Sequence, residues 1–175
     1  MNILLIPNLR KEHAKEITVQ VVDILSQCPV SLFMGEHLLP EFEGLPVQFV
    51  PLEEEGLSVD FIIAIGGDGT IIGSSRYATA FHAPILGVNV GRLGFLASVE
   101  RGQLSLLKRL TTGEYTLDKR MLLDVAVLEK GGALREQYLA LNDAVFSKGA
   151  ISRMIELDVR HEDTLVGEMC IRDSL

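Results

Sequence analysis

The stretch VDFIIAIGGDGT, residues 59–70, decides the fold of this chain. Residues 59–65 are nearly all apolar and partly β-branched, which is typical of a parallel strand covered on both faces. Three glycines and an aspartate follow at residues 66–69, and residues 70–80 then have a helical pattern. A buried strand that leads through a glycine-rich turn into a helix predicts an α/β layered domain.

The same alternation extends on both sides of this stretch. Apolar residues three and four apart predict a helix over residues 14–28, and a second helix is expected over residues 104–110. Short apolar runs predict further strands at residues 3–6, 30–34, 47–50 and 84–88. After about residue 117 the pattern becomes strand-like, at residues 122–128, 134–141 and 154–159. We therefore expect a Rossmann-like α/β domain over residues 1–116 and the start of a β-rich, sandwich-type domain over residues 117–175.

Composition excludes several classes of protein. The chain has 175 residues, a net charge of −8 and 47% hydrophobic residues, which is typical of a globular domain and excludes intrinsic disorder. No dense basic block is present to bind nucleic-acid phosphates, so we expect no nucleic-acid partner. Asp60 and the glycine cluster interrupt the most apolar stretch, so we expect no membrane span. Cys28 and Cys170 are far apart, which favours reduced thiols in a cytoplasmic protein.

Asp68 is the informative residue of the glycine cluster. Glycines between a strand and a helix let backbone N–H groups approach phosphate oxygens, and the helix dipole attracts the same anions. A carboxylate at this place repels phosphate, so Asp68 is expected either to hold Mg²⁺ between phosphates or to accept a proton from a hydroxyl that attacks a phosphoryl group. The alternative is structural: residues 68–69 form a tight turn, and Asp68 or Thr70 caps the helix.

Two common nucleotide motifs do not fit. The phosphate loop G-x-x-x-x-G-K-[ST] does not occur in the sequence. Gly67, Gly69 and Gly73 approach the dinucleotide fingerprint, but Asn89 stands where an acidic residue would meet the ribose. A Rossmann dehydrogenase is therefore disfavoured.

Three segments in order resemble the NAD kinase family. GGDGT, residues 66–70, resembles the signature that NAD kinases share with diacylglycerol- and sphingosine-type lipid kinases and, in part, with 6-phosphofructokinases. GVNVGRLGFL, residues 87–96, is similar to an NAD kinase block, and LNDAV at residues 141–145, with Lys148 and Gly149, is similar to its N-[DE] motif. The resemblance covers residues 1–167 and implies a phosphofructokinase-like first domain.

The resemblance implies a reaction and a set of site residues. The family transfers a phosphoryl group from ATP or polyphosphate to the 2′-hydroxyl of the adenosine ribose of NAD, with a divalent metal ion, here expected to be Mg²⁺, and gives NADP. Family members assemble as dimers or tetramers, so a homo-oligomer is expected. By resemblance Asp68 is the general base and the other contacts to nucleotide and phosphates come from Gly67, Gly69, Asn142, Asp143 and Arg153.

The last residues depart from the family pattern. The family continues after Gly167 with D-G, whereas residues 168–175 here are EMCIRDSL. Our hypothesis is a truncated family member with a foreign tail, expected to have weak or no activity, exposed apolar surface and a tendency to associate. A lipid kinase, which residues 89–96 disfavour, and a non-catalytic dinucleotide-binding module are the alternative functions.

Other residues near these motifs are expected to be structural. Phe95 and Leu96 are apolar and are expected in the core beneath the site. Arg76 follows the glycine cluster by two helical turns, and a surface salt bridge is favoured for it over a contact with phosphate.

Overall fold

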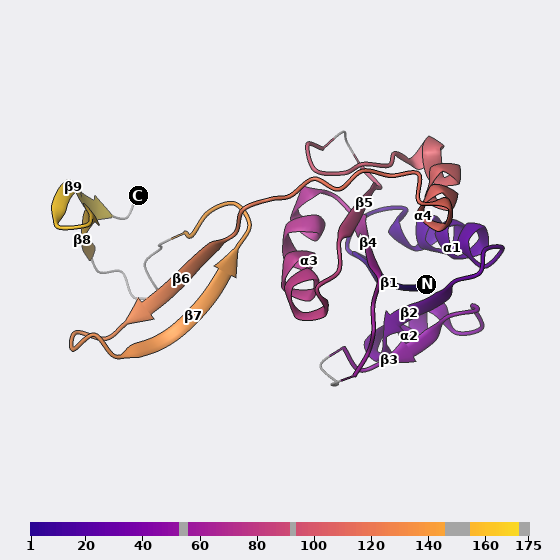
Figure 1. Cartoon of the computed structure of the whole chain (residues 1–175), viewed down its shortest axis with the longest axis horizontal. Helices are drawn as coiled ribbons and strands as arrows, with labels where there is room; N and C mark the ends of the chain where they lie inside the picture. Colours follow the sequence, from indigo (N-terminus) through magenta and orange to yellow (C-terminus); the bar gives the residue numbers. More distant parts are fainter. Residues whose placement is uncertain (53–55, 92–93, 146–154, 172–175) are drawn as a thin grey trace. The chain divides into compact units, whose positions relative to one another are not determined.

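The computed structural model describes residues 1–52, 56–91, 94–145 and 155–171 (Figure 1). The chain divides into two compact units, Met1–Asn142 and Asp143–Leu175. The expected domain boundary near residue 117 stays a prediction.

A five-stranded parallel sheet forms the centre of the first unit, in the order β3-β2-β1-β4-β5. From β1 the chain moves outward to β2 and β3, then crosses to the other side of β1 for β4 and β5. The loops that follow β1 and β4 therefore leave adjacent strands in opposite directions, which is the topological switch point where open α/β sheets bind ligands. The α/β prediction is confirmed, with strands β1 (Asn2–Pro7), β2 (Ser31–Gly35), β3 (Gln48–Val50), β4 (Phe61–Gly66) and β5 (Ile85–Asn89).

Helices cover both faces of this sheet (Figure 1). Alternate side chains of β1 and β4 point to opposite faces, so Ile3 and Ile63 pack with α1 (Ala14–Leu25) while Leu4 and Ile62 pack beside α3 (Asp68–Phe81). All four side chains are fully buried. The short elements η1 (Glu36–Leu38) and α2 (Leu39–Phe42) follow β2. The continuous apolar strands of the sequence are thus explained by a sheet enclosed between two helical layers.

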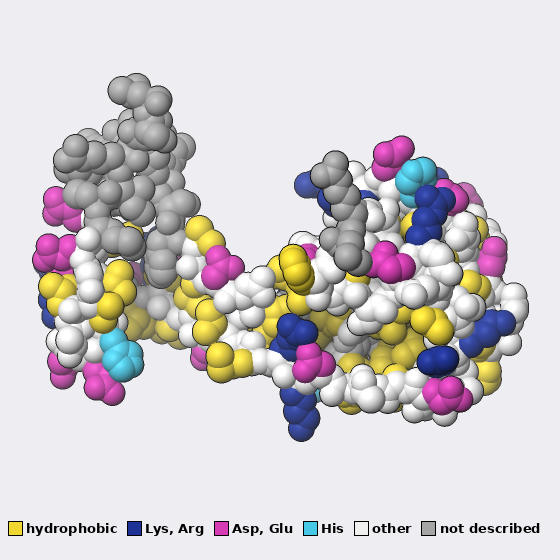
Figure 2. Space-filling view, turned by 90° about the horizontal axis from the view of Figure 1, so that it is seen from above, with side chains coloured by type: hydrophobic (Ala, Val, Ile, Leu, Met, Phe, Trp, Pro, Cys, Tyr) yellow, Lys and Arg dark blue, Asp and Glu magenta, His cyan; other side chains and the backbone are white. Residues whose placement is uncertain are grey.

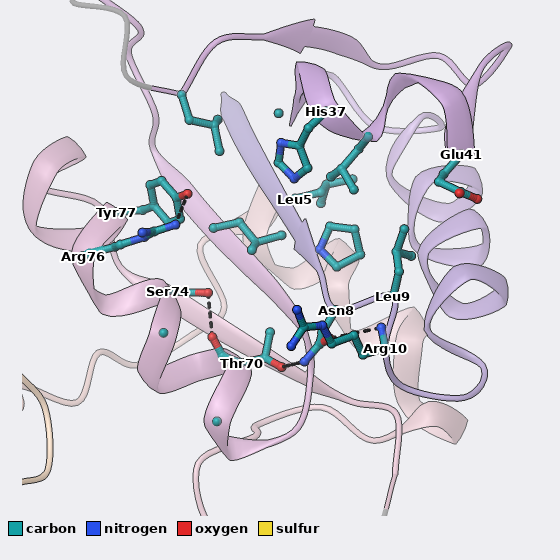
Figure 3. Close-up of a pocket in the computed structure, with 17 residues that line it drawn as sticks. Leu5, Asn8, Leu9, Arg10, His37, Glu41, Thr70, Ser74, Arg76 and Tyr77 are labelled. Atoms are coloured by element: carbon teal, nitrogen blue, oxygen red, sulfur yellow. Dashed lines mark hydrogen bonds between the residues drawn. The ribbon is translucent and has the colours of Figure 1, made fainter. Parts of the chain in front are cut away.

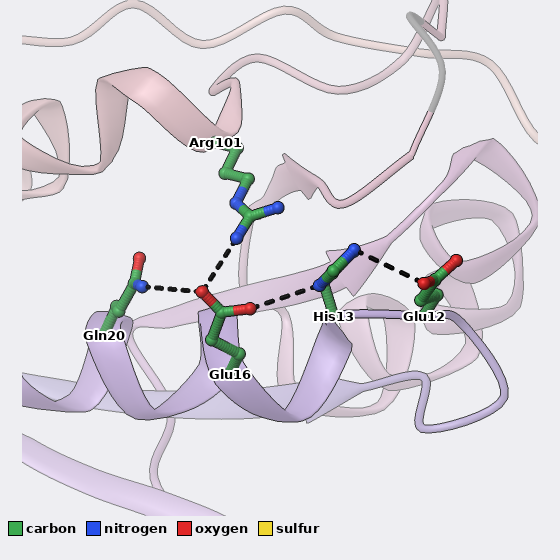
Figure 4. Close-up of polar contacts among 5 residues, drawn as sticks. All are labelled: Glu12, His13, Glu16, Gln20 and Arg101. Carbon is green, nitrogen blue, oxygen red and sulfur yellow. Dashed lines mark hydrogen bonds and ion pairs between the residues drawn. The ribbon is translucent and has the colours of Figure 1, made fainter.

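An ion pair holds helix α1 to residue Arg101, which lies far along the chain. The Arg101 guanidinium donates to Glu16 Oε1 at 2.7 Å, although the two residues are 85 positions apart. His13 and Gln20 bond the same carboxylate (Figure 4). The hydrogen bond from His13, together with the Arg101 charge, lowers the pKa of Glu16 from its ordinary 4.5.

The expected helix over residues 104–110 begins earlier and is wound more tightly. A 3₁₀ helix, η2 (Arg101–Lys108), leads into one turn of α-helix, α4 (Arg109–Thr112). Leu104 and Leu107 of η2 are buried three residues apart, which is the 3₁₀ period, and Leu110 of α4 is buried three residues further on. The threefold spacing keeps all three leucines on the face that packs against α1.

Two antiparallel hairpins follow. In the first unit β6 (Leu123–Leu128) pairs with β7 (Leu134–Ala140), and in the second β8 (Ile155–His161) pairs with β9 (Thr164–Ile171). Strand β9 was not predicted, and it includes residues 168–171 of the stretch that departs from the family pattern; residues 172–175 lie outside the described residues.

The first hairpin exposes apolar side chains. Leu128, Leu134 and Tyr138 each keep more than half of their surface exposed, as expected for a two-stranded ribbon with no described layer packed on it. On the face seen in Figure 2, acidic and basic side chains are interspersed between such yellow patches. None of the described helices has both the length and the apolar character that crossing a bilayer requires. The predicted tendency to associate stays a prediction.

Candidate active site

The glycine cluster joins β4 to α3 at the switch point. Gly66 is the last residue of β4 and Gly67, in an extended conformation, precedes the first helical residue, Asp68. The carbonyl of Gly66 accepts a hydrogen bond from Val90 N–H at 3.0 Å, which ties this turn to the end of β5. No side-chain hydrogen bond caps α3, so the structural alternative in which Asp68 or Thr70 caps the helix is wrong.

Asp68 instead reaches across to the segment after β5. Its Oδ2 accepts a hydrogen bond from Phe95 N–H at 3.0 Å, and its Oδ1 accepts one from Leu96 N–H at 3.1 Å. A Cβ atom at Gly94 would overlap the Asp68 carboxylate, so glycine is needed there for this contact. The first two sequence motifs therefore form one structure in which the second motif fixes the orientation of the carboxylate of the first.

The loop after β1 is tied to the same turn. The Asn8 side-chain amide donates to Thr70 Oγ1 at 3.0 Å, and Asn8 N–H donates to the carbonyl of Ile65 at 2.9 Å. A Cβ atom at Gly66 would overlap the Thr70 side chain, so Gly66 lets Thr70 occupy this position. The sequence analysis missed Asn8 and its contact with Thr70, because the two residues are 62 positions apart.

Gly67 and Gly69 differ from Gly66. A Cβ atom at either would meet no described atom within 4 Å, and neither has the positive φ that favours glycine. Packing within the described chain therefore does not demand glycine at these positions. Both residues lie at the start of α3, where an anion is favoured.

Asn89 has a structural position in the second motif. Its side chain is almost fully buried; Nδ2 donates to the Glu100 carboxylate at 3.1 Å and Oδ1 accepts from Gly91 N–H. Glu100 also caps η2 together with Gln103. Asn89 thus organises the turn after β5, which accounts for an asparagine where the dehydrogenase pattern has an acid.

Two expectations about neighbouring side chains are wrong. Phe95 was expected in the core, but 99% of its surface is exposed because its backbone turns toward Asp68; Leu96 is half-buried. Arg76 has no ion pair with a described residue. Its guanidinium lies 4.5 Å from the ring centre of Tyr77 and donates to the Tyr77 hydroxyl at 2.7 Å.

The third motif is described only in part. Asn142 and Asp143 are exposed and follow the end of β7, and they fall at the division between the two units. Arg153 lies outside the described residues. The structure therefore brings together Gly67, Asp68 and Gly69, while the positions of Asn142, Asp143 and Arg153 relative to them stay predictions.

Metal ligands are sparse. Within the described ranges, no group of three or more His, Cys, Asp or Glu side chains converges on a point. Asp68 is a single carboxylate on its loop. Such a site suits Mg²⁺ only if phosphates and water supply the other ligands, which is the usual situation for Mg²⁺ bound with a nucleotide.

Comparison with known proteins agrees with this geometry. The family described as the ATP-NAD kinase N-terminal domain matches residues 47–115, which contain both motifs that meet at Asp68. The NAD kinase of Natranaerobius thermophilus is 36% identical over 157 residues, which are 89% of this chain and 54% of that protein. The NAD kinase of Desulforamulus reducens is 38% identical over 164 residues, and that of Symbiobacterium thermophilum 44% identical over 155 residues. This chain belongs to the NAD kinase family.

The alignments with these NAD kinases cover most of this chain but only about half of each relative. The alignments cover 93% of this chain and 56% of the Desulforamulus protein, and 79% of this chain and 54% of the Symbiobacterium protein. The chain thus spans about half the length of the curated NAD kinases it matches. That half includes the α/β sheet, the glycine cluster and the segment that holds Asp68.

Proposed function

We propose that this chain provides the phosphate-handling part of an NAD kinase, which transfers the terminal phosphoryl group of ATP or polyphosphate to the 2′-hydroxyl of the adenosine ribose of NAD. The observation that carries the proposal is the Asp68 carboxylate, fixed by two backbone N–H groups at the start of α3. The substrates are inferred from the family. The role of the Asp68 carboxylate is inferred from this geometry.

Asp68 would orient the acceptor hydroxyl. A carboxylate has about four acceptor positions, and the bonds from Phe95 and Leu96 use two of them. The ribose 2′-hydroxyl donates to a remaining position, its oxygen attacks the terminal phosphorus, and the bond from that phosphorus to its bridging oxygen breaks. ADP leaves with the electron pair of that bond, and the hydroxyl proton passes to Asp68. Because a ribose hydroxyl is a far weaker acid than a carboxylic acid, orientation is the larger part of this role.

The start of α3 would receive the phosphates. Gly67 and Gly69 carry no side chain that could block an approach to the backbone, and the positive end of the helix dipole favours an anion there. A divalent ion, Mg²⁺ in this proposal, would supply positive charge to the donor phosphates when bound. Asp68 is the described residue that would contact it.

The remaining site residues extend the proposal to NAD itself. Asn142 and Asp143 would contact the dinucleotide, with Asp143 accepting hydrogen bonds from ribose hydroxyls, and Arg153 would add a basic contact. We also expect the full-length protein to be a homo-oligomer in the cytoplasm, as its family suggests.

The test is product formation by the full-length protein. NAD, ATP and Mg²⁺ are supplied, and NADP is measured with an NADP-specific dehydrogenase; diacylglycerol replaces NAD in a parallel reaction. NADP without phosphorylated lipid is the expected result. Phosphorylated lipid would identify a lipid kinase, and NAD binding without turnover would identify a non-catalytic module; either result would contradict the proposal.

A further inference from the structure

A cavity of about 800 Å³ lies at the switch point, between the loop after β1 and one face of α3 (Figure 3). This volume is within the range of small-molecule sites. Thr70, Gly73, Ser74 and Tyr77 line it from α3, at the spacing of a single helix face. The residues nearest the start of the helix are small, so this end of the cavity is open to the backbone at Gly69.

The arginines of the chain are distributed unevenly around this cavity. Of the seven arginines in the described ranges, five have a carboxylate partner within 4.0 Å: Arg101, Arg109, Arg120, Arg135 and Arg160. The two without such a partner among the described residues, Arg10 and Arg76, both line the cavity. In a chain of net charge −8, two arginines left without carboxylate partners in one cavity are a marked local excess of positive charge.

Polar contacts hold the Arg76 guanidinium and the Arg10 backbone and leave guanidinium donors available. Arg76 donates to the Tyr77 hydroxyl and lies over its ring, and the guanidinium has five N–H donors in total. Arg10 follows Asn8, whose Oδ1 accepts Arg10 N–H at 3.2 Å and whose amide is bonded to Thr70. Figure 3 shows Arg76 entering from α3 and Arg10 from the loop after β1.

The acidic side chain of the cavity does not cancel this charge. Glu41 lines the far side, but its Oε2 accepts a hydrogen bond from Lys15 Nζ at 2.8 Å, so its charge is already paired. Guanidinium groups bind phosphate oxygens with two parallel hydrogen bonds, and two of them can engage successive phosphates of one chain.

We propose that this cavity binds the phosphate chain of the phosphoryl donor, with Arg10 and Arg76 as its cationic contacts. The inference rests on the proposed kinase function and assigns the donor to the β1 side of α3. The acceptor would then approach from the side of Asp68, whose carboxylate faces Phe95 and Leu96. The recognised chemistry is a linear polyphosphate, whether free or attached to adenosine.

Binding of ATP, inorganic tripolyphosphate and adenosine to the full-length protein tests the assignment. Loss of one charged hydrogen-bonding partner should weaken binding about tenfold. We expect Arg10→Gln and Arg76→Gln each to raise the Kd of ATP and tripolyphosphate by about that factor and Arg76→Lys to restore part of the loss for Arg76. Arg109→Gln removes the same charge outside the cavity and should change Kd less than twofold. Adenosine binding should not respond to any of these variants, and Tm is measured to check that each variant folds.

Kinetics then separate this inference from the kinase proposal. The two glutamine variants should raise the KM for ATP and leave the KM for NAD unchanged. A raised KM for NAD with an unchanged KM for ATP would overturn the donor assignment while the kinase proposal stood. Arginine-dependent tripolyphosphate binding without NADP formation would refute the kinase and retain the anion site. Unchanged tripolyphosphate binding in both folded variants would refute the anion site.

Discussion

Replacing Gly94 with alanine tests whether the segment after β5 holds the Asp68 carboxylate in place. The new Cβ would overlap Asp68 Oδ1 and lie 3.0 Å from its Cγ and 3.2 Å from its Oδ2. Asp68 is a short side chain and must rotate away, which breaks its bonds to Phe95 and Leu96. A hydrogen bond to a charged group contributes about 1.5–3 kcal/mol, but this site is half-buried and water can replace most of both bonds. The net cost to folding should therefore be about 1 kcal/mol, or roughly 2–4 °C in Tm.

The effect on catalysis should be much larger than the effect on stability. Displacing a reacting group by about 1 Å costs on the order of 100-fold in rate, so the full-length Gly94→Ala protein should form NADP at about 1% of the wild-type rate. Hydrogen exchange at the Phe95 and Leu96 amides should accelerate by about tenfold, the equivalent of one lost bond. Gly102→Ala in η2 is the matched control, because its Cβ meets no described atom within 4 Å. A Gly94→Ala protein with the wild-type rate and unchanged amide protection would refute this reasoning.

Other substitutions test the fold around the site. The pKa of Glu16 is lowered, so its stabilising contribution is present above pH 4.5 and is lost as pH falls through the folded-state pKa. Glu16→Gln should therefore lower Tm at pH 7, and its deficit should shrink steadily as the pH is lowered below 4.5; a deficit independent of pH would contradict this. Gly87→Ala places a Cβ against Ile71 and 3.0 Å from the Ala97 Cα, so urea denaturation should show a loss of about 2 kcal/mol; a loss below about 0.5 kcal/mol would mean that the contact can relax. His82 ends α3 with φ of 51°, so His82→Gly should raise the free energy of unfolding by about 0.5–1 kcal/mol, and any decrease would count against a strained end.

Much of the fold follows from local patterns. The five strands of the sheet were predicted because each contains a short apolar run, and α1 was predicted from the spacing of its apolar residues. Helix α3 was predicted from the helical pattern that follows the glycine cluster. The 3₁₀ winding at Leu104 and Leu107 was missed, although an interval of three between apolar residues is consistent with it. Strand β9 was missed because its apolar and polar residues alternate only weakly. Its pairing with β8 is what makes it a strand, and the sequence does not show that pairing.

The geometry of the site depends on contacts that sequence spacing does not encode. Asp68 was identified by its unusual place among glycines, but its bonds to Phe95 and Leu96 span 27 and 28 positions. Phe95 was assigned to the core because it is apolar; the backbone requirement of Asp68 instead turns it outward. Asn8 and Arg10 follow an ordinary buried strand, and their importance emerges only when β1 and β4 become neighbours.

Asp68→Asn in the full-length protein tests the central claim most directly. The amide keeps the size of the side chain, but it removes the negative charge and turns an N–H group toward one of the two backbone donors. NAD affinity is measured by calorimetry and kcat by NADP formation. The account predicts a loss of at least about 100-fold in kcat, typical of a missing general base, with NAD affinity within about threefold of wild type. A variant that keeps the wild-type kcat would contradict it.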